Sequence, residues 1–492
     1  MQQLVDLVHT DLHDSWPDQA EQAFEALFGS GGGRYRTYAA DKVKVRNPGT
    51  GTKVPYAALI HPSNPDSGAY GGMSFVVFPT DEDGTPALFG LVLGTQGLSP
   101  DETILARPGH ARRAQAICTW LNQRFKNESP AKDIVAWGKQ DPVRIDQKIP
   151  ANIRKKFSDY GPVFDKYGGE VYAVFQPPGP KKATEKALKA FLDLLFEERG
   201  EQPLSGASRE AERIQSGYFA HILPSTTTPD IANTLANRRY VILQGPPGTG
   251  KTRMALQLLD DEYNGHGTSI QFHPNTTYED FIGGLAPVRS EAGMGFRFEP
   301  QKGALMKAAE AALDDPDRPY LLHIDEINRA DLAKVLGEAV FLLEYRRQKQ
   351  QPIELPYDFG EPFGNEFVLP DNLHILGTMN TSDRSIAILD VAIRRRFGFA
   401  ELWPQLDVVR EHGGELAERK FRELLDIFVE HSTDDSFSLL PGHSYFLEKD
   451  ADATKKSLNL HLKPLLEEYV AQGYVAGFEE EVRSYIQSLK SL

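Results

Sequence analysis

Apolar runs separated by turn-forming residues mark the first third of the chain. Gly71-Gly72 and Asp83-Gly84 lie between the runs, and such punctuation is typical of strands joined by hairpins. Apolar positions at helical spacing follow over residues 114–125. The sequence therefore predicts a separate α+β domain over residues 1–176. Its expected strands are the runs 56–60, 73–78, 87–93 and 171–175.

A proline-rich stretch at 176–180 follows this domain and predicts a stiff linker. Thr184 is then a suitable N-cap for a helix whose apolar face lies between residues 188 and 195. The polar stretch 197–210 predicts a second flexible boundary. Residues 177–210 are therefore expected to be a linker that contains one helix.

Apolar runs alternate with helical patterns over residues 211–400, and this alternation predicts a parallel sheet with helices on both faces. From residue 405 onward the pattern is largely helical, which predicts a helical lid within residues 401–492. The expected fold class is α/β, with a parallel-sheet core and a helical lid, preceded by the α+β domain. The strands expected in the core sheet are 240–244, 269–272, 320–324 and 373–379.

Length and composition narrow the class of protein. The chain has 492 residues, enough for about two to four domains, and a net charge of −15. No apolar stretch approaches the length of a membrane span, and the acidic N-terminus is unlike a secretion signal. The single cysteine, Cys118, cannot form an internal disulfide. We therefore expect a cytoplasmic protein that is not associated with a membrane.

The run 240–244 ends in a complete phosphate-binding loop, in which Gly245 and four further residues precede Gly250-Lys251-Thr252. The glycines let backbone N–H groups turn toward an anion, and Lys251 reaches the outer phosphates. The Thr252 hydroxyl is placed to ligate Mg²⁺. The chain is therefore expected to bind a nucleoside triphosphate. The nucleotide-binding residues are Gly245, Pro246, Pro247, Gly248, Thr249, Gly250, Lys251 and Thr252.

A second apolar run, 320–324, ends at two adjacent carboxylates, Asp325 and Glu326. This arrangement suits phosphoryl transfer, because one acid can hold the Mg²⁺ shell and the next can polarise the attacking water. The alternative is a strand that merely ends in acidic residues, which the preceding phosphate-binding loop disfavours. We assign Asp325, together with Thr252, to Mg²⁺ and Glu326 to the water.

Polar and basic residues follow the next apolar run. Asn380 is expected to orient the attacking water, with Asp383 close enough to assist, although Asn, Ser and Asp also favour plain turns. The triplet Arg394-Arg395-Arg396 then lies between apolar residues. In ring-forming ATPases an arginine at this point reaches the nucleotide of the neighbouring subunit. An arginine finger of this kind requires an oligomer, because one subunit cannot complete its own site.

These motifs resemble the McrB family of AAA+ motors, the nucleotide-driven subunits of modification-dependent restriction systems. The distinctive family element is Met-Asn-Thr-Ser-Asp-Arg-Ser at 379–385, and the resemblance covers about half the chain, 240–446. It implies an AAA+ fold for the core and lid. It also implies that Asn380 and Asp383 position the hydrolytic water, and that Arg384 or the arginine triplet acts at the subunit interface. The matching segments are 243–252, 271–273, 278–282, 324–330, 379–385, 394–397 and 442–446.

The resemblance also implies partners. By family analogy the motor forms hexameric rings, is stimulated by a separately encoded, McrC-like nuclease subunit, and uses GTP in its best-known member. No residue in this sequence decides between GTP and ATP, because the glycine-rich loop reads phosphates and not the base. His443 could contact the nucleotide from the lid, or could serve only to pack the lid against the core.

The N-terminal domain, residues 1–176, is expected to recognise the DNA target. Its basic residues are clumped, which suits a phosphate backbone, although a solvated surface is the alternative. The domain loosely resembles recognition domains fused to McrB-type motors, some of which flip a modified base into an aromatic pocket. Aromatic residues in strands are otherwise core residues. We expect this domain to bind DNA, modified or not. The basic clumps lie within 34–53, 107–126 and 148–156.

The expected function is an oligomeric nucleoside-triphosphatase that drives translocation or remodelling on DNA in defence against foreign DNA. The alternative is an AAA+ ATPase of the MoxR type, which remodels a protein complex. Residues 1–175 hold 19 basic and 20 acidic side chains, so most of the negative charge lies in the motor half. That acidity favours the alternative, because a DNA-threading surface should be basic. The element at 379–385 favours the McrB-type function.

Overall fold

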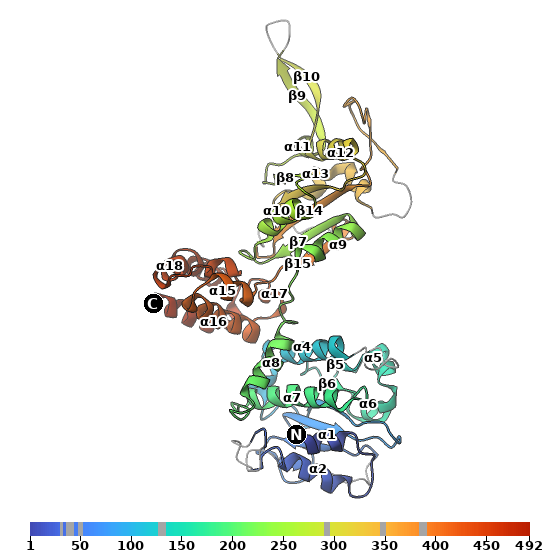
Figure 1. The fold of residues 1–492 in the computed structure, drawn as a ribbon, viewed down its shortest axis with the longest axis vertical. Helices are drawn as coiled ribbons and strands as arrows, with labels where there is room; N and C mark the ends of the chain where they lie inside the picture. Colours follow the sequence, from blue (N-terminus) through green and yellow to red (C-terminus); the bar gives the residue numbers. More distant parts are fainter. Residues whose placement is uncertain are drawn as a thin grey trace. The chain divides into compact units, whose positions relative to one another are not determined.

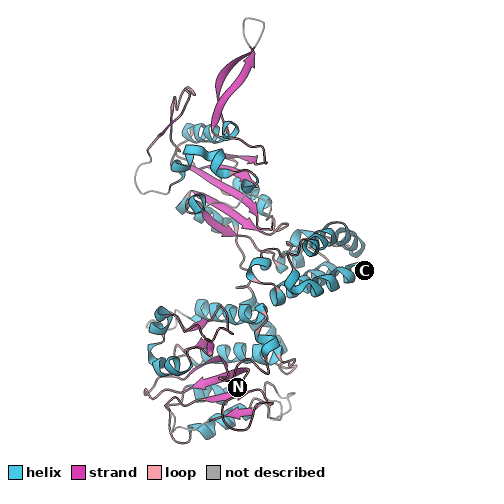
Figure 2. Ribbon diagram, turned by 180° about the vertical axis from the view of Figure 1, so that it is seen from behind, coloured by secondary structure: helices cyan, strands magenta, loops and turns pink. Residues whose placement is uncertain are grey.

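The computed structural model describes residues 1–29, 33–35, 44–47, 53–125, 134–289, 296–344, 351–382 and 391–492. These residues form two compact units, each containing both helices and strands (Figures 1 and 2). Unit 1 comprises Met1–Leu223 and Asp426–Thr433, and unit 2 comprises Pro224–Leu425 and Asp434–Leu492. Each unit has its own main sheet and its own hydrophobic core.

Unit 1 is built on a six-stranded antiparallel sheet in the order β1-β2-β3-β4-β6-β5. Its central strands are buried on both faces, which is why each of them is a continuous apolar run in the sequence. The four strands expected in this region are confirmed. The strands are β1 (Lys44–Arg46), β2 (Ala57–Ile60), β3 (Met73–Phe78), β4 (Leu88–Leu93), β5 (Ala136–Gly138) and β6 (Val171–Phe175).

Helices cover both faces of this sheet. On one face, Val76 and Phe78 of β3 join a hydrophobic cluster with Phe164 of α6. On the other face, Phe75 meets Phe24 of α2 with ring centroids 6.4 Å apart, as expected from the alternation of side chains along a strand. The helices described in unit 1 are α1 (Gln2–Val8), α2 (Trp16–Glu25), α3 (Glu102–Leu105), α4 (Pro108–Phe125), α5 (Ala151–Lys156), α6 (Gly161–Tyr167), α7 (Lys181–Glu198) and α8 (Ser208–Phe219), with the 3₁₀ turn η3 (Ser158–Tyr160).

Helix α7 occupies most of the region 177–210, which the sequence predicts to be a linker. The helix contacts α1, α4 and β3, and its residues Phe191 and Leu195 are fully buried. The compact unit therefore extends past residue 176, because α7 supplies part of its core. The predicted N-cap at Thr184 is wrong: the helix begins at Lys181, and the Thr184 hydroxyl lies 2.8 Å from the ring of His9.

A buried ionic network ties α7 to an N-terminal segment. Arg34 Nε and one of its terminal nitrogens donate to the two carboxylate oxygens of Asp193, at 2.8 and 2.6 Å. Its other terminal nitrogen donates to Glu210 at 2.8 Å, and the Tyr35 hydroxyl donates to Asp193 at 2.5 Å. Arg34 belongs to the first basic clump, but its side chain is only 5% exposed. It is therefore a structural residue and is not available to a phosphate backbone.

We expect Arg34→Ala to destabilise unit 1 by about 3–5 kcal/mol, because the Asp193 carboxylate would stay buried without its partner. Urea unfolding followed by tryptophan fluorescence measures this, since Trp16, Trp120 and Trp137 all belong to unit 1. Lys181→Ala is the control, because its ion pair with Asp6 is exposed and should contribute below about 1 kcal/mol. Equal shifts in the two variants would contradict the prediction.

Unit 2 is built on a five-stranded sheet in the order β15-β7-β14-β11-β8, and every neighbouring pair is parallel. This sheet confirms the α/β class expected for the core. The strand before the phosphate-binding loop, β7, and the strand before the two carboxylates, β11, both pair with β14. The carboxyl ends of all three strands therefore meet at one edge. The strands are β7 (Tyr240–Gly245), β8 (Gly267–Gln271), β11 (Tyr320–Asp325), β14 (Leu373–Asn380) and β15 (Gly398–Glu401).

Two hydrophobic clusters lie on opposite faces of this sheet. Leu243 of β7 packs with Leu258 of α10 in one cluster, and Ile242 packs with Leu305 of α12 in the other. Helices therefore cover both faces, as the alternating pattern predicts. The helical elements of the core are α9 (Thr228–Arg238), α10 (Lys251–Asp261), α11 (Tyr278–Phe281), α12 (Ala304–Asp314), η4 (Ile327–Arg329), α13 (Leu332–Leu336), η5 (Gly337–Leu343) and α14 (Val391–Arg394).

A hairpin that the sequence pattern does not predict extends from this core between α11 and α12 (Figure 1). It consists of β9 (Gly283–Arg289) and β10 (Phe296–Lys302), which pair antiparallel, and Phe296 and Phe298 are largely exposed on it.

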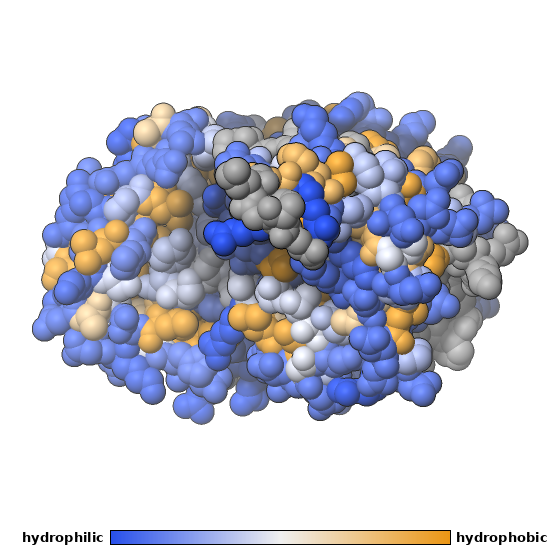
Figure 3. Space-filling model, turned by 90° about the horizontal axis from the view of Figure 1, so that it is seen from above, coloured by the Kyte–Doolittle hydropathy of each residue, from blue (hydrophilic) through white to orange (hydrophobic). Residues whose placement is uncertain are grey.

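A second short pair joins β12 (Ile353–Glu354) to β13 (Glu366–Phe367). The face in Figure 3 is mostly hydrophilic, with apolar residues in small groups.

The C-terminal region is helical, as expected for a lid. Among the residues described above, no helix is long and apolar enough to cross a membrane. The helical elements from residue 406 onward are α15 (Leu406–His412), α16 (Glu415–His431), α17 (Asp434–Phe437), η6 (His443–Phe446), α18 (Ala451–Ser457), the π-helical turn η7 (Leu458–Leu462), α19 (Lys463–Ala471), η8 (Ala476–Phe478) and α20 (Glu479–Lys490).

Candidate nucleotide-binding and catalytic site

The phosphate-binding loop connects the end of β7 to the start of α10, in the order that its sequence requires. Gly248 and Gly250 both have positive φ, at 79° and 83°, a backbone conformation that glycine adopts at little cost. A Cβ on Gly248 would also come within 2.5 Å of the Ser444 hydroxyl. The loop is further held by Thr249, whose hydroxyl donates to the carbonyl of Pro246 at 3.0 Å.

Lys251 lies inside this loop. Its side-chain nitrogen donates to the carbonyl oxygens of Gly245 and Pro246, at 3.0 and 2.7 Å. Burial lowers the pKa of Lys251 to about 8, and the nearby carboxylates of Asp325 and Glu326 only partly offset this shift. The ammonium group is thus poorly solvated, and a phosphate would be a stronger partner for it than the two carbonyls.

Asp325 forms a junction between the ends of three neighbouring strands. The Thr252 hydroxyl, in the first turn of α10, donates to Asp325 Oδ1 at 2.9 Å. The Thr378 hydroxyl of β14 also donates to this oxygen and accepts from the backbone N–H of Glu326 at 3.3 Å. Thr378 is absent from the sequence-based site. Its signal was available, because it precedes Asn380 by two residues on the strand expected beside β11.

Thr252 and Asp325 fit the expected Mg²⁺ role. Mg²⁺ prefers oxygen ligands and in phosphoryl-transfer sites is held by one or two protein oxygens together with the phosphates. A hydroxyl and a carboxylate oxygen 2.9 Å apart, beside the phosphate-binding loop, supply that donor set. In the described part of the chain, no group of three or more His, Cys, Asp or Glu residues suits a metal ion.

Glu326 has an unusual backbone conformation. Its φ and ψ are 51° and 47°, in the left-handed region, where a side chain costs of the order of 1–3 kcal/mol. Its carboxylate forms an ion pair with Arg329 of η4, and the Glu326 side chain is 23% exposed. Residues held in this region cluster at functional sites, so the strain is consistent with the predicted catalytic role. The sequence-based site did not include Arg329.

Asn380 ends β14 and pairs in register with Gly245, the first residue of the phosphate-binding loop. The next residue, Thr381, donates its backbone N–H to the Gly245 carbonyl at 3.0 Å. The structure therefore brings Asn380 to the same sheet edge as Asp325. Asp383 and Arg384, also assigned to the site from the sequence, lie outside the described residues.

The three arginines of the triplet have different environments. Arg394 lies over the ring of Phe399, at 5.2 Å from its centroid. Arg395 has a 66% exposed side chain, 3.9 Å from Glu344. Arg396 is buried, and it donates to the Ala392 carbonyl at 2.7 Å and to Glu344 at 2.9 Å. Arg396 is therefore engaged within its own chain, whereas Arg395 is available to another molecule.

The lid contacts the phosphate-binding loop directly. Gly442 and Ser444 donate their backbone N–H groups to the carbonyls of Pro247 and Gly248, at 2.8 and 3.0 Å. A Cβ on Gly442 would meet the backbone of Gly248 at 2.0 Å, so only glycine fits there. His443 accepts from the backbone N–H of Gln405 at 3.2 Å, and burial lowers its pKa to about 4. This segment thus packs the lid on the core, and a nucleotide contact by His443 stays a prediction.

These features define a class of protein. The parallel sheet with β14 between β7 and β11, the phosphate-binding loop and the paired carboxylates are those of a P-loop nucleoside-triphosphatase of the AAA+ type. A family model described as an AAA domain of the dynein-related subfamily matches residues 240–397.

Comparison with curated proteins identifies the family. The EcoKMcrB subunit of a type IV methyl-directed restriction enzyme from Escherichia coli K12 is 35% identical over 350 residues. The match covers 65% of this chain and 75% of that protein, and the chain therefore belongs to the McrB-like family of AAA+ proteins.

Other relatives are more distant. The YdiS component of the type II restriction enzyme BsuMI from Bacillus subtilis is 30% identical over 209 residues, which are 36% of this chain and 60% of that protein. The solved structure of NtrX from Brucella abortus in complex with ATP is 12% identical, over 62% of this chain and 76% of its own. Its TM-score is 0.24, and a likeness at this level supports no conclusion about the chain.

Triphosphate affinity should fall as the pH rises above about 8. Lys251 has a pKa of about 8 in the free protein, and bound phosphates would raise this pKa by favouring the charged amine. Below pH 8 the lysine is charged in both states and affinity is constant. Above pH 8 binding requires proton uptake, so Kd should rise by up to about tenfold per pH unit.

Calorimetric titration at pH 7, 8 and 9, in buffers of different ionisation enthalpy, measures both Kd and proton uptake. Lys251→Arg is the matched control, because arginine stays charged throughout this range and should remove the pH dependence. The same proton uptake in Lys251→Arg would show that another group titrates.

Proposed function

We propose that this protein is the nucleotide-driven motor of a restriction system that acts on foreign DNA. In this proposal unit 2 hydrolyses GTP or ATP in the cytoplasm, and a separately encoded, McrC-like nuclease cuts the DNA. Family membership supports the proposal, and the two curated relatives are both named as parts of restriction enzymes.

The contact between Thr252 and Asp325 is the observation that carries the hydrolytic part of the proposal. These residues would hold Mg²⁺, which when bound neutralises charge on the β- and γ-phosphates. Lys251 would leave the carbonyls of Gly245 and Pro246 and bind the outer phosphates. Charge on the transferred phosphoryl group would then be balanced by groups already fixed in place.

Glu326 is the proposed base for the attacking water, and Asn380 would orient that water with the help of Asp383. The carboxylate of Glu326 is paired with Arg329, and this pairing competes with any hydrogen bond to water. Hydrolysis therefore requires the carboxylate to turn at least partly from Arg329.

We infer that the active form is a ring, proposed to be a hexamer. In this ring one chain completes the nucleotide site of the next chain. Arg395 is the proposed finger, because it is exposed, whereas Arg396 is held inside its own chain. Arg384 is the other candidate from the family resemblance. A single arginine supplied in trans accelerates phosphoryl transfer by about 10³–10⁵.

Unit 1 is proposed to bind DNA, modified or not. The basic clumps differ in exposure and in ion pairing, and therefore in how well they could bind a phosphate backbone. Arg107 and Arg113 both pair with Glu430, which belongs to the same unit, so the second clump is partly neutralised. The third clump is exposed on and before α5, and within it Arg154 pairs with Asp165. Its residues are Lys148, Arg154, Lys155 and Lys156.

Remodelling of a protein complex, as in MoxR-type AAA+ proteins, is the second candidate. The negative charge of the motor half favours it, because DNA does not thread easily through an acidic ring. DNA binding by the full chain that weakens steeply with salt supports the first candidate. Absence of any DNA binding, with hydrolysis that no DNA stimulates, supports the second.

Glu326→Gln should bind a triphosphate normally but hydrolyse it at least about 100-fold more slowly, because the amide cannot accept the proton of the water. Filter retention of labelled triphosphate together with phosphate release measures both quantities. Arg329→Ala serves as a companion variant that frees Glu326 and should leave hydrolysis intact. Near-normal turnover by Glu326→Gln would remove this residue as the base.

Arg395→Ala should reduce hydrolysis by about 10³-fold or more as a pure protein, and mixing it with Lys251→Ala should restore part of the activity. In the mixture, a Lys251→Ala chain supplies Arg395 to an intact phosphate-binding loop. Phosphate release measured across mixing ratios tests this.

Arg396→Ala is the matched control. It removes the neighbouring arginine, whose contact with Glu344 lies within its own chain. Its defect should appear as lower thermal stability, with no recovery on mixing. Equal recovery with Arg396→Ala, or no recovery with Arg395→Ala, would contradict the assignment of the finger.

A further inference from the structure

Helix α16 is shared between the two units. Its residues up to Leu425 belong to unit 2, and its last residues, from Asp426 onward, belong to unit 1. The helix contains neither glycine nor proline between Glu415 and His431. Sharp kinks in helices arise mainly at such residues, so α16 is expected to move as one rigid element. A movement of one part of this helix would therefore displace the other part.

In unit 1 the end of α16 is held by three arginines of the second basic clump. Arg107 and Arg113 both pair with the Glu430 carboxylate, at 2.9 and 3.1 Å. The Arg112 guanidinium donates to two backbone carbonyls at the end of the helix, at 2.5 and 2.9 Å. Cations are favoured at this position, because the last carbonyls of a helix lack partners within it and carry partial negative charge. These three arginines thus fasten the end of α16.

The packing around this end is close. A Cβ on Gly109 of α4 would come within 2.6 Å of the Glu430 Cα, so only glycine fits at this point. Phe428 and Val429 are fully buried, and the Glu430 side chain is 13% exposed. Breaking an ion pair at this depth is costly, because the remaining charge would stay buried without its partner. The end of α16 is therefore firmly attached to α4.

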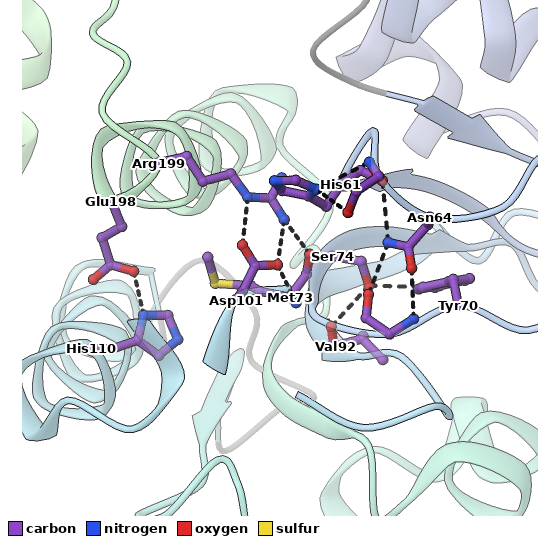
Figure 4. Close-up of polar contacts among 12 residues, drawn as sticks. His61, Asn64, Tyr70, Met73, Ser74, Val92, Asp101, His110, Glu198 and Arg199 are labelled. Carbon is purple, nitrogen blue, oxygen red and sulfur yellow. Dashed lines mark hydrogen bonds and ion pairs between the residues drawn. The ribbon is translucent and has the colours of Figure 1, made fainter. Parts of the chain in front are cut away.

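Helix α4 is in turn fixed to the sheet of unit 1 by His110. One ring nitrogen of His110 lies 2.5 Å from the Glu198 carboxylate of α7, as Figure 4 shows, and the other lies 2.9 Å from the Tyr172 hydroxyl of β6. The side chains of His110 and Glu198 are 0% and 2% exposed. Figure 4 also shows the ion pair of Arg199 with Asp101, at 2.9 Å, next to Glu198 in sequence. A displacement of α16 would therefore be passed through α4 to α7 and the sheet.

In unit 2 the other part of α16 packs on the segment that contacts the phosphate-binding loop. The rings of Phe421 and Phe446 have centroids 5.0 Å apart, and both side chains are fully buried. Phe446 belongs to η6, and Ser444 of the same turn donates its backbone N–H to the Gly248 carbonyl of the loop at 3.0 Å. From Phe421 to Glu430 the helix rises about 14 Å. Contacts therefore continue from the loop to the end of α16.

We propose that α16 couples DNA binding by unit 1 to the nucleotide site of unit 2, with Glu430 as the positioning residue that fastens its end. The inference rests on the proposed function, in which unit 1 binds DNA and unit 2 hydrolyses a triphosphate, and it names how one regulates the other. A triphosphate that draws Lys251 away from the loop carbonyls acts on α16 through η6. DNA that shifts the helices of unit 1 acts on the nucleotide site through the same helix.

Such coupling is reciprocal, because two linked binding equilibria change each other's affinity by the same factor. Fluorescence anisotropy of the full chain with a labelled DNA duplex, plain or methylated, measures the DNA Kd in Mg²⁺ with and without the γ-thio analogue of GTP or ATP. The ratio of the two Kd values is the coupling factor. We expect this factor to depart from one by at least about fivefold. Phosphate release with and without saturating duplex measures DNA stimulation of hydrolysis in the same protein.

Glu430→Gln should bring the coupling factor below about twofold, because the amide keeps the size of the side chain but loses the ion pairs. DNA binding without nucleotide and hydrolysis without DNA should both be retained. Gly109→Ala is a second variant, which adds one methyl group against the backbone of Glu430 and removes no charge. It should lower the coupling factor in the same way.

Glu423→Gln is the matched control. Glu423 lies on the same helix and pairs with Lys420, and both residues belong to unit 2. This variant removes one carboxylate from α16 without loosening its end, so the coupling factor should equal that of the unaltered protein. Circular dichroism verifies that each variant is folded.

Each contrary outcome bears on a different claim. A coupling factor near one in the unaltered protein, with DNA binding and hydrolysis both present, overturns the inference and leaves both activities of the proposed function intact. Coupling that Glu430→Gln and Gly109→Ala retain as fully as Glu423→Gln also overturns it. No binding to any duplex overturns the inference together with the DNA-binding part of the proposed function.

Discussion

The nucleotide site depends on the hydrogen bonds of one carboxylate, Asp325. Thr252 reaches it from the first turn of α10, and Thr378 reaches it from β14, the strand between the phosphate-binding loop and the acidic strand end. Side chains of α10, β11 and β14 that are far apart in sequence are thereby held at hydrogen-bonding distance. Parallel pairing brings them to one edge of the sheet, and the Asp325 contacts fix their polar groups there. The next residue, Glu326, has a left-handed backbone, and its N–H donates to the Thr378 hydroxyl of the same junction.

The backbone of the phosphate-binding loop, which is expected to bind the triphosphate, also forms hydrogen bonds with the lid. Gly442 and Ser444 bind the outer carbonyls of Pro247 and Gly248, so any change in the loop on phosphate binding is passed directly to the lid. The loop is also where Lys251 is held in a poorly solvated state with a lowered pKa. A triphosphate that withdraws Lys251 from its carbonyls therefore alters a segment to which the lid is hydrogen-bonded. In the proposed function, these hydrogen bonds would connect the nucleotide state to the helical region.

The features that could be predicted from the sequence are those that depend on a few neighbouring residues. The phosphate-binding loop, Asp325 and the parallel sheet could be predicted because glycine spacing and apolar runs act over a few residues. Arg329 lies within the matching segment 324–330 and Thr378 directly precedes the segment 379–385, yet both were missed, because their roles follow from an ion pair with Glu326 and from the register of β14 beside β11. Arg396 looks equivalent to Arg395 in sequence and both lie near Glu344, but the Arg396 side chain is 4% exposed whereas that of Arg395 is 66% exposed. The region of helix α7 was predicted to be a linker because a proline-rich stretch precedes it and a polar stretch follows it. Its burial depends on long-range contacts such as that of Asp193 with Arg34, 159 positions away.

We propose that a DNA-dependent motor is built around the Asp325 junction. The most direct measurement is triphosphate hydrolysis by the purified full chain, with ATP beside GTP, in the presence and absence of plain and methylated duplex DNA. We expect Mg²⁺-dependent turnover of at least one triphosphate and stimulation by at least one form of DNA. Turnover that is indifferent to every DNA would contradict the DNA-dependent motor and favour remodelling of a protein partner.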